Sequence, residues 1–238
     1  MKNGTLFIVA TPIGNLDDIT KRAIDIISSV DFVACEDTRV AGGLLHHLGI
    51  KKELISLHQH SSDEKIDYII RELRRGKNIA YVSDSGTPGI SDPGQALIVQ
   101  IRNPNVEIRN KRNQIQNSNI QIIPIPGASA VTAAISISGM VDKEFYFVGF
   151  LPKKKGRETK FKELAVLKAP IVVYESAQRL EKTLNDIKSH FGAGSEVFLA
   201  REMTKKFEEY WGGDISEIIS DLTLHVLKGE FVLIVSRK

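Results

Sequence analysis

The amino-acid sequence predicts an α/β protein with two α/β domains: a mostly parallel N-terminal sheet with flanking helices, and a mixed C-terminal sheet. In the first half, short apolar runs alternate with segments whose apolar residues recur at helical spacing, the pattern of repeated βα units. In the second half the apolar runs follow one another more closely and are partly hairpin-like, which favours a mixed sheet. We place the domains at 1–125 and 126–238.

The first domain is expected to contain parallel strands joined by helices. The strands are predicted at Leu6–Ala10, Phe32–Cys35, Leu54–Leu57, Ile79–Val82 and Ile120–Ile125. The helices are predicted over 18–29, 41–48, from a capping box of Ser61 and Glu64 to Gly76, and over 93–101; a further helix, from Ala130 to Ser138, is predicted just past the domain boundary. The segment Arg102–Asn119 has six Asn, three Arg and one Lys against one Glu. This composition predicts an exposed loop, and a basic arm that touches RNA is the alternative.

The second domain combines further strands with a basic segment. Its strands are predicted at Phe145–Phe150, Ile171–Tyr174, Glu196–Ala200, Phe207–Trp211 and Glu230–Ser236. Helices are predicted over 178–190 and, after a capping pair of Asp214 and Glu217, through Leu224. From Leu151 to Lys168 there are seven Lys or Arg against two Glu, so positive charge gathers there.

Composition limits the class of protein. The chain has 238 residues, 42% hydrophobic and 26% charged, which is ordinary for a globular protein with a real core. No apolar run approaches the ~20 residues of a membrane span, and the N-terminus leads almost directly into a strand, so neither a membrane segment nor a signal peptide is expected. Cys35 is the single cysteine, which excludes an intrachain disulfide. These features predict a cytoplasmic protein.

Several familiar site motifs are missing. There is no phosphate-binding G-x-x-x-x-G-K-[ST], no G-x-G-x-x-G after the first strand, and no G-x-S-x-G nucleophile turn. His58 and His60 have no third ligand at a familiar spacing, so no metal site is predicted. Cys35 is expected to be a small core residue rather than a nucleophile. The net charge of +3 does not by itself predict a nucleic-acid partner.

Polar residues gather where the predicted strands end. The longest such stretch is Ser83–Gly94, whose glycines allow close backbone approach and whose prolines stiffen it. Taken alone, this stretch fits either an elaborate turn or a binding loop. TPIGN, CEDTR, HQH and PGASA follow the other strands of the first domain, and YES and AREMTK follow strands of the second. Because ligands bind beyond the carboxyl ends of strands in open α/β sheets, this placement favours a ligand site.

Nine sequence blocks also occur together in the order, and nearly with the spacing, of a known family. They are TPIGNLDDIT, CEDTR, LHQH, VSDSGTPGISDPG, PIPGASA, GFLPKKKGR, YES, AREMTK and GEFVLIV. On these blocks, which extend over almost the whole chain, the sequence resembles the bacterial 16S rRNA (cytidine 2′-O)-methyltransferases of the tetrapyrrole methylase superfamily.

The resemblance implies a cofactor, an assembly and a site. It implies S-adenosylmethionine bound in a cleft between the two domains of a homodimer. The residues implied to bind the cofactor are Pro12, Asp84, Ser85, Gly86, Thr87, Pro88, Ser129, Ala130, Tyr174, Ala200, Arg201, Gly229 and Glu230. A cofactor without phosphate, met by backbone groups and short polar side chains, is consistent with the missing phosphate-binding motifs.

The implied reaction is methyl transfer to a cytidine 2′-hydroxyl of small-subunit ribosomal RNA, naked or in the assembled subunit. The candidates for the catalytic base are Glu36, Asp37 and Asp84, of which Asp84 and Glu36 are preferred, and Glu202 and Lys205 are the alternatives. For each of them a structural hydrogen bond or ion pair is the competing interpretation. The residues expected to contact RNA are Arg39, Lys153, Lys154, Lys155 and Arg157.

The sequence departs from the family pattern in two places. Arg102–Asn119 is longer than the usual connection, and the chain ends directly after the last predicted strand, whereas many relatives continue with a helical appendage. Two other functions remain open. One is the same fold and cofactor acting on a porphyrinoid or diphthamide intermediate, against which TPIGN, CEDTR and the basic block argue. The other is a non-catalytic RNA-binding module.

Overall fold

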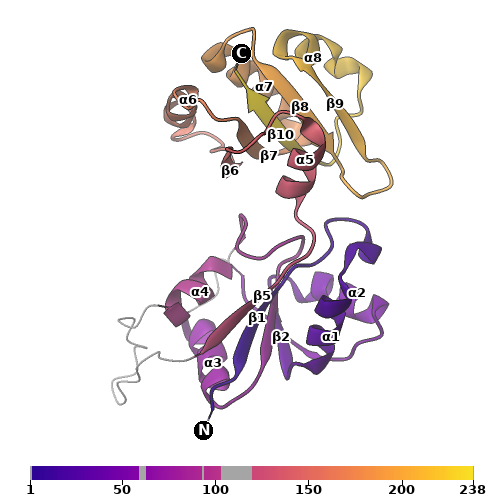
Figure 1. Ribbon diagram of the computed structural model, residues 1–238, viewed down its shortest axis with the longest axis vertical. Helices are drawn as coiled ribbons and strands as arrows, with labels where there is room; N and C mark the ends of the chain where they lie inside the picture. The colour runs from indigo at the N-terminus through magenta and orange to yellow at the C-terminus, as the bar shows by residue number, and fades with distance from the viewer. Residues whose placement is uncertain (1, 59–62, 93, 103–119, 238) are drawn as a thin grey trace. The chain divides into compact units, whose positions relative to one another are not determined.

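The protein divides into two compact units, each with its own sheet. The computed structural model describes residues 2–58, 63–92, 94–102 and 120–237. The units are Met1–Ser129 and Ala130–Lys238 (Figure 1). The division predicted after residue 125 lies at the end of the last strand of the first unit, a few residues earlier. The asparagine-rich segment from residue 103 and the expected capping residue Ser61 lie outside the described residues.

The sheet of the first unit is entirely parallel, as the βα alternation predicts. Its strand order is β3-β2-β4-β1-β5, and every neighbouring pair runs in the same direction. The strands are β1 (Thr5–Val9), β2 (Phe32–Cys35), β3 (Glu53–Ser56), β4 (Ile79–Val82) and β5 (Gln121–Ile125). The central strands β2 and β4 are buried along their whole length, which explains why they are continuous apolar runs.

Helices cover both faces of this sheet (Figure 1). They are the short 3-10 helix η1 (Leu16–Asp18), α1 (Lys21–Ser29), α2 (Thr38–His47), α3 (Asp63–Arg74) and α4 (Gly94–Arg102). One apolar core joins the sheet to α1 and α2, and a second joins it to α3 and α4. The helix expected over 18–29 is divided, because Thr20 caps α1 by accepting a hydrogen bond from Ala23 N at 3.1 Å. Asp37 caps α2 in the same way, so α2 begins before the expected Ala41.

The sheet of the second unit is mixed, as predicted. Its order is β6-β7-β10-β8-β9, with β6 and β7 parallel and the other neighbours antiparallel. The strands are β6 (Tyr146–Phe150), β7 (Ile171–Ser176), β8 (Glu196–Arg201), β9 (Glu209–Asp214) and β10 (Glu230–Ser236). β9 begins two positions later than expected and runs to Asp214, because it pairs with β8 as far as Glu196.

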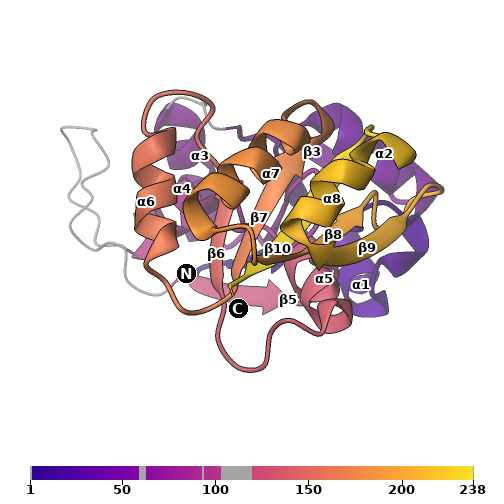
Figure 2. The same ribbon diagram turned by 90° about the horizontal axis from the view of Figure 1, so that it is seen from above.

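The helices of the second unit lie on opposite faces of its sheet. They are α5 (Ala130–Ser138), α6 (Arg157–Ala165), α7 (Ala177–Phe191), α8 (Ile215–Asp221) and the short η2 (Leu222–Leu224). α6, α7 and α8 lie together over one face and form the main apolar core with it (Figure 2). α5 contacts β10. Within the described ranges, no helix has the length and apolarity needed to cross a membrane.

Candidate functional site

Three strand-end loops of the first unit are bound to one another. The carboxyl ends of β1, β4 and β5 lie at the same edge because these strands are parallel neighbours. Thr11 N donates to Gly86 O at 3.0 Å, and the Thr11 hydroxyl donates to Ser83 O at 3.2 Å. The Thr87 hydroxyl donates to Ala128 O at 3.0 Å. The TPIGN, SDSGTPG and PGASA blocks therefore form one continuous rim.

Glycines stand where these loops approach most closely. Gly86 has φ of +79°, and a Cβ there would lie 3.1 Å from Ile13 Cγ2. A Cβ on Gly127 would lie 3.0 Å from the Cβ of Ala10. Both positions therefore favour a residue without a side chain, the first for its backbone angle and the second for space. Beside them, Pro12 and Pro88 are buried, whereas Asp84 and Ser85 are exposed.

A fourth loop joins the rim through Asp84. Its Oδ1 accepts a hydrogen bond from Asp37 N at 2.9 Å, so the end of β4 is tied to the CEDTR block after β2. The Asp37 carboxylate in turn accepts hydrogen bonds from Arg39 Nε at 3.0 and 3.1 Å. The side chain and backbone of Arg39 lower the pKa of Asp37 to about 2. The Asp37 carboxylate is thus ionised and already bound to Arg39, and its low pKa makes it a weak base.

Glu36 differs from its neighbour in its electrostatic surroundings. Burial raises the pKa of Glu36 above its usual 4.5, and the negative charges of Asp84, Asp92 and Asp37 raise it further. Carboxyl groups with a raised pKa are stronger proton acceptors once ionised. Burial also raises the pKa of the adjacent Cys35 thiol to about 11, consistent with a small core residue rather than a nucleophile.

Asp92 organises the second half of the Ser83–Gly94 loop, a role that we did not assign from the sequence. Its carboxylate accepts hydrogen bonds from the backbone of Gly89, from Ile90 N at 3.2 Å and from Gly94 N at 2.7 Å. An Asp inside a loop rich in Gly and Pro is a sequence signal for such bonds, because its short carboxylate reaches backbone N–H groups a few residues away. Pro93 lies outside the described residues.

In the second unit, Tyr174 and Ala200 share one face of the sheet. Both pair with Val232 across β10, so their side chains point to the face opposite the main core, which holds Val173, Leu199 and Leu233. The Tyr174 ring packs against Phe147 and Phe150, with ring centroids 5.1 and 5.5 Å apart. Burial raises the pKa of Tyr174, so its hydroxyl stays protonated.

The end of β8 and the start of β10 form a tightly bonded corner. Glu202 has a left-handed φ of +47°, its N–H donates to Glu230 O at 2.9 Å, and its Oε1 accepts from Glu230 N at 3.0 Å. Lys205 Nζ binds the carboxylates of Glu202 and Glu230, both at 2.9 Å. A Cβ on Gly229 would overlap the carboxyl group of Glu202. Strained, over-determined backbone of this kind is common at functional sites.

This corner makes poor catalytic bases of Glu202 and Lys205. Burial acts to raise the pKa of Glu202, but the hydrogen bonds from Lys205 and Glu230 N outweigh it, and the net shift is downward. For Lys205 burial acts to lower the pKa, and the bonds to the two carboxylates reverse this, so the ammonium form is favoured. Arg201 is also engaged internally, donating to Lys228 O at 2.8 Å and Phe207 O at 3.2 Å.

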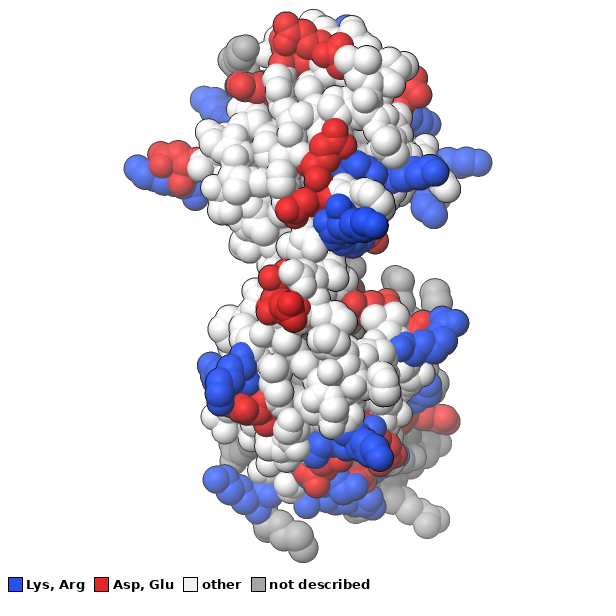
Figure 3. Space-filling model, turned by 90° about the vertical axis from the view of Figure 1, so that its right-hand side faces the viewer, with Lys and Arg blue, Asp and Glu red and all other residues white. Residues whose placement is uncertain are grey.

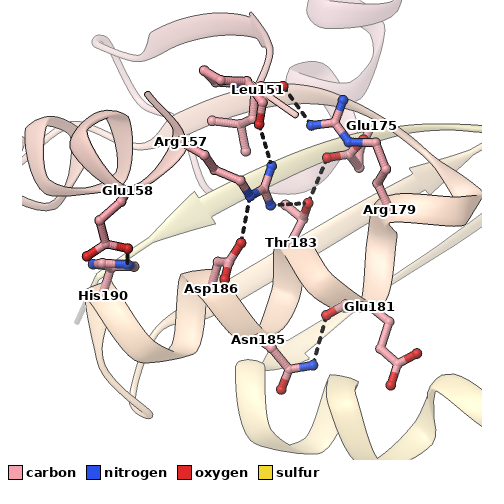
Figure 4. Close-up of polar contacts among 11 residues, drawn as sticks. Leu151, Arg157, Glu158, Glu175, Arg179, Glu181, Thr183, Asn185, Asp186 and His190 are labelled. Carbon is pink, nitrogen blue, oxygen red and sulfur yellow. Dashed lines mark hydrogen bonds and ion pairs between the residues drawn. The ribbon is translucent and has the colours of Figure 1, made fainter. Parts of the chain in front are cut away.

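The residues expected to contact RNA separate into two kinds. Lys153, Lys154 and Lys155 are exposed in the loop between β6 and α6, and the Arg39 side chain is 89% exposed. Arg157, predicted to lie with them, is instead only 6% exposed. Its guanidinium donates to Asp186 and Thr183 (Figure 4) and to Pro152 O. It is therefore an internal residue, and the prediction that it contacts RNA is corrected.

Charge is mixed on one face of the molecule. On the face that Figure 3 presents, Lys and Arg side chains stand beside Asp and Glu side chains rather than in one basic field. Among the residues that the structure describes, no three His, Cys, Asp or Glu side chains are grouped so as to hold a metal ion. With Arg157 buried, the predicted RNA contacts left in the second unit are the lysines of the β6–α6 loop.

The predicted cofactor residues fall into one set in each unit. Pro12, the Asp84–Pro88 stretch and Ser129 belong to the first unit, and Thr87 and Thr11 connect their loops. The second set comprises Ala130, Tyr174, Ala200, Arg201, Gly229 and Glu230. Within it, Tyr174 and Ala200 share a sheet face, and Arg201, Gly229 and Glu230 meet at the corner of β8 and β10.

Comparison with known proteins places the chain in a family. The family model described as Tetrapyrrole (Corrin/Porphyrin) Methylases matches residues 5–219. The chain is 41% identical to the "Ribosomal RNA small subunit methyltransferase I" of Synechocystis, over 98% of this chain and 79% of that protein. It is 42% identical to the protein of the same name from Haemophilus influenzae, over 99% of this chain and 79% of that protein.

Solved structures share the fold at low identity. Diphthine synthase superimposes with a TM-score of 0.69 at 10% identity, over 98% of this chain and 89% of that chain. The Thermus thermophilus uroporphyrin-III C-methyltransferase complexed with S-adenosylhomocysteine superimposes with a TM-score of 0.62 at 13% identity, over 98% and 97%. These likenesses concern the fold alone. Together with the family model and the relatives at about 41% identity, they lead to one conclusion: the chain belongs to the tetrapyrrole (corrin/porphyrin) methylase family and, within it, to the group of the ribosomal RNA small subunit methyltransferase I proteins.

Proposed function

We propose that the protein uses S-adenosylmethionine to methylate the 2′-hydroxyl of a cytidine ribose in small-subunit ribosomal RNA. The observation that carries this proposal is the identity of 41–42% over nearly the whole chain to relatives named as small-subunit ribosomal RNA methyltransferases. We further propose that the protein acts in the cytoplasm, where such RNA is made. We also propose that it acts as a homodimer.

The strand-end rim of the first unit fits the chemistry of the cofactor. S-adenosylmethionine offers a carboxylate, an amine, a ribose diol and an adenine, and no phosphate. Within the rim, Gly86 and Gly127 leave backbone groups uncovered by side chains. Asp84, Ser85 and Thr87 add short polar side chains to it. In the second unit, Tyr174 and Ala200 supply an apolar face, and Gly229 and Glu230 supply backbone groups beside it. These residues and Pro12, Pro88, Ser129, Ala130 and Arg201 are the proposed cofactor contacts.

The reaction requires the ribose 2′-hydroxyl to be positioned against the methyl group and to lose its proton. When bound, the cofactor supplies a methyl group already activated by a sulfonium. The protein then has to hold the 2′-oxygen in line with that group and accept the hydroxyl proton. Glu36 is the proposed base, because its pKa is raised by burial and by three neighbouring carboxylates. Asp84, exposed and fixed by Asp37 N, is proposed to face the ribose beside it.

RNA contact is proposed for Lys153, Lys154, Lys155 and Arg39. Exposed cations bind phosphate by releasing counterions, and the lysine loop carries three of them in succession. The target nucleotide has to be single-stranded or splayed for its 2′-hydroxyl to be reached.

One set of assays tests this proposal. The protein is incubated with S-adenosylmethionine carrying a labelled methyl group and with unmethylated small subunits, or with their naked RNA. We expect label in the RNA and none in a substrate whose target cytidine is a 2′-deoxynucleotide. Label in a porphyrinoid instead, or no cofactor binding by calorimetry, would refute the proposal in favour of its two alternatives. Sedimentation analysis of the free protein tests the homodimer, and a monomer at micromolar concentration would refute it.

A further inference from the structure

Two buried charged side chains of the second unit, Arg157 and Glu175, are joined through one hydroxyl group. Arg157 is 6% exposed, Glu175 1% and Thr183 between them 0%. The Thr183 hydroxyl accepts a hydrogen bond from Arg157 Nη2 at 2.8 Å and donates one to Glu175 Oε2 at 2.7 Å (Figure 4). Because a hydroxyl is both acceptor and donor, it satisfies the guanidinium and the carboxylate at once.

The outer ends of this network hold the backbone that leads into the lysine loop. Arg157 Nη1 donates to Pro152 O at 3.1 Å, and Arg179 Nη2 donates to Leu151 O at 2.6 Å. Arg179 is itself held by Glu175, with Nε 3.2 Å from Oε1. The two carbonyl groups directly before Lys153 are therefore bound by two arginines, and these are linked because Arg157 bonds Thr183, Thr183 bonds Glu175, and Glu175 holds Arg179.

The other end of the loop is fixed as well. Gly156 adopts φ of +79°, and Arg157 N donates to Lys154 O at 3.2 Å. Arg157 Nε is 2.7 Å from Asp186 Oδ2, which attaches the start of α6 to α7. The backbone of Lys153–Lys155 thus lies between two anchored ends, while the three side chains are exposed.

We propose that Arg157, Thr183, Glu175 and Arg179 are positioning residues that hold the lysine loop ready for RNA phosphates. The proposal rests on the RNA methylation proposed above and adds how its RNA contact is built. Stability alone is a weak explanation for such a network, because burying charges carries a desolvation cost that an apolar core avoids. Preordering of the lysine loop is a physical reason for such a network, because a loop that is already ordered loses less conformational entropy when it binds RNA.

Thr183 is the residue at which to test the network, because it is uncharged and fully buried and cannot itself touch RNA. Thr183→Val keeps the shape and removes the hydroxyl, and Thr183→Ser keeps the hydroxyl. We measure binding of an in vitro transcript of small-subunit ribosomal RNA over a range of salt concentrations. Cofactor affinity is measured by calorimetry. Asn185→Ala is the matched control, because Asn185 lies on the exposed side of the same helix and bonds only Glu181 O in Figure 4.

The expected result is specific to RNA. Thr183→Val should weaken RNA binding about five- to tenfold, the effect of losing one buried hydrogen-bond bridge. The slope of affinity against salt should stay as in the wild type, because no charge is removed. Cofactor affinity should be unchanged, and Thr183→Ser and Asn185→Ala should bind RNA like the wild type. In a protein that already lacks the three lysines, Thr183→Val should have no further effect.

Two outcomes would overturn the positioning role. One is wild-type RNA affinity for Thr183→Val, and the other is an equal loss of RNA and cofactor affinity, which would indicate general damage to the unit. Failure of the wild-type protein to bind or methylate the RNA refutes the proposed function itself, and the wild-type arm of the experiment reports this separately.

Discussion

Asp84 accepts the backbone N–H of Asp37 at 2.9 Å, so the strand-end loops after β4 and β2 are joined by a single side chain. The two residues are 47 positions apart in the sequence and meet because β2 and β4 are parallel neighbours. The same bond leaves Glu36 next to Asp84, whose charge contributes to the raised pKa of Glu36. One contact therefore links the shape of the rim to the basicity of the proposed base.

Substitution of Asp84 should affect activity far more than stability. Asp84→Ala should lower kcat/KM by about 10² or more, the usual contribution of proton-transfer assistance, because Asp84 is proposed to face the ribose and its charge helps to raise the pKa of the base Glu36. Loss of the bond to Asp37 N should cost only about 1 kcal/mol of the free energy of unfolding, because Asp84 is exposed. Asp84→Asn keeps an oxygen for Asp37 N and should be as inactive as Asp84→Ala. If Asp84→Asn methylates RNA at the wild-type rate, Asp84 acts only through its hydrogen bond.

The raised pKa of Glu36 predicts how methyl transfer depends on pH. A base works when ionised, so kcat should rise with pH through the pKa of Glu36, above the usual 4.5. Glu36→Gln should lower kcat strongly and remove this acid limb. A pH–rate profile of both proteins checks this, and an acid limb that persists in Glu36→Gln would assign it to another group.

The same raised pKa predicts an effect on stability. A carboxyl whose pKa is higher in the folded protein favours folding below its unfolded pKa, near 4.5, and this contribution is lost as pH rises through the folded value. Glu36→Gln should therefore raise the Tm at pH 7, with a gain that shrinks toward pH 4. Thermal melts of the two proteins across this range measure it, and a Tm gain that is the same at every pH would contradict the ionisation of Glu36 as its cause.

Gly86 should matter to the cofactor rather than to the fold alone. Gly86→Ala forces a side chain into φ of +79°, which costs about 1–2 kcal/mol, and places its Cβ 3.1 Å from Ile13 Cγ2. Gly49 has φ of +68° with nothing within 4 Å of an added Cβ, so Gly49→Ala carries a similar backbone cost away from the rim. Calorimetry should show weaker S-adenosylmethionine binding for Gly86→Ala only. Equal cofactor affinity in the two variants would place Gly86 outside the site.

The lysine loop should set the salt dependence of RNA binding. Replacing Lys153, Lys154 and Lys155 by Ala should reduce the magnitude of the slope of log affinity against log salt by about two, at ~0.7 for each contact to a single strand. Lys162→Ala is the control, because Lys162 is 70% exposed on α6 and lies 3.4 Å from Glu158. An unchanged slope in the triple variant would show that RNA binds to another surface of the protein.

Much of the fold followed from local patterns. The alternation of apolar runs and helical periods predicts the parallel sheet, because each βα unit carries its own signal. β2, β4 and β10 match their predicted bounds because they are continuous apolar runs with polar ends. The start of α2 was missed by three residues, because the capping bond from Arg39 N to Asp37 leaves no periodic apolar signal.

The sequence by itself determined which segments carry polar strand ends, and it determined the family through blocks spread along the whole chain. Only the tertiary structure decided which of those side chains face solvent. Arg157 and Lys155 belong to the same basic run, yet Arg157 turns inward because Thr183 and Asp186 of a later helix offer it partners. The pKa of Glu36 likewise depends on Asp84 and Asp92, which lie far along the chain. Hydrogen bonds and charge interactions act through space, so residues distant in sequence set them, and local patterns carry no record of which partners will meet.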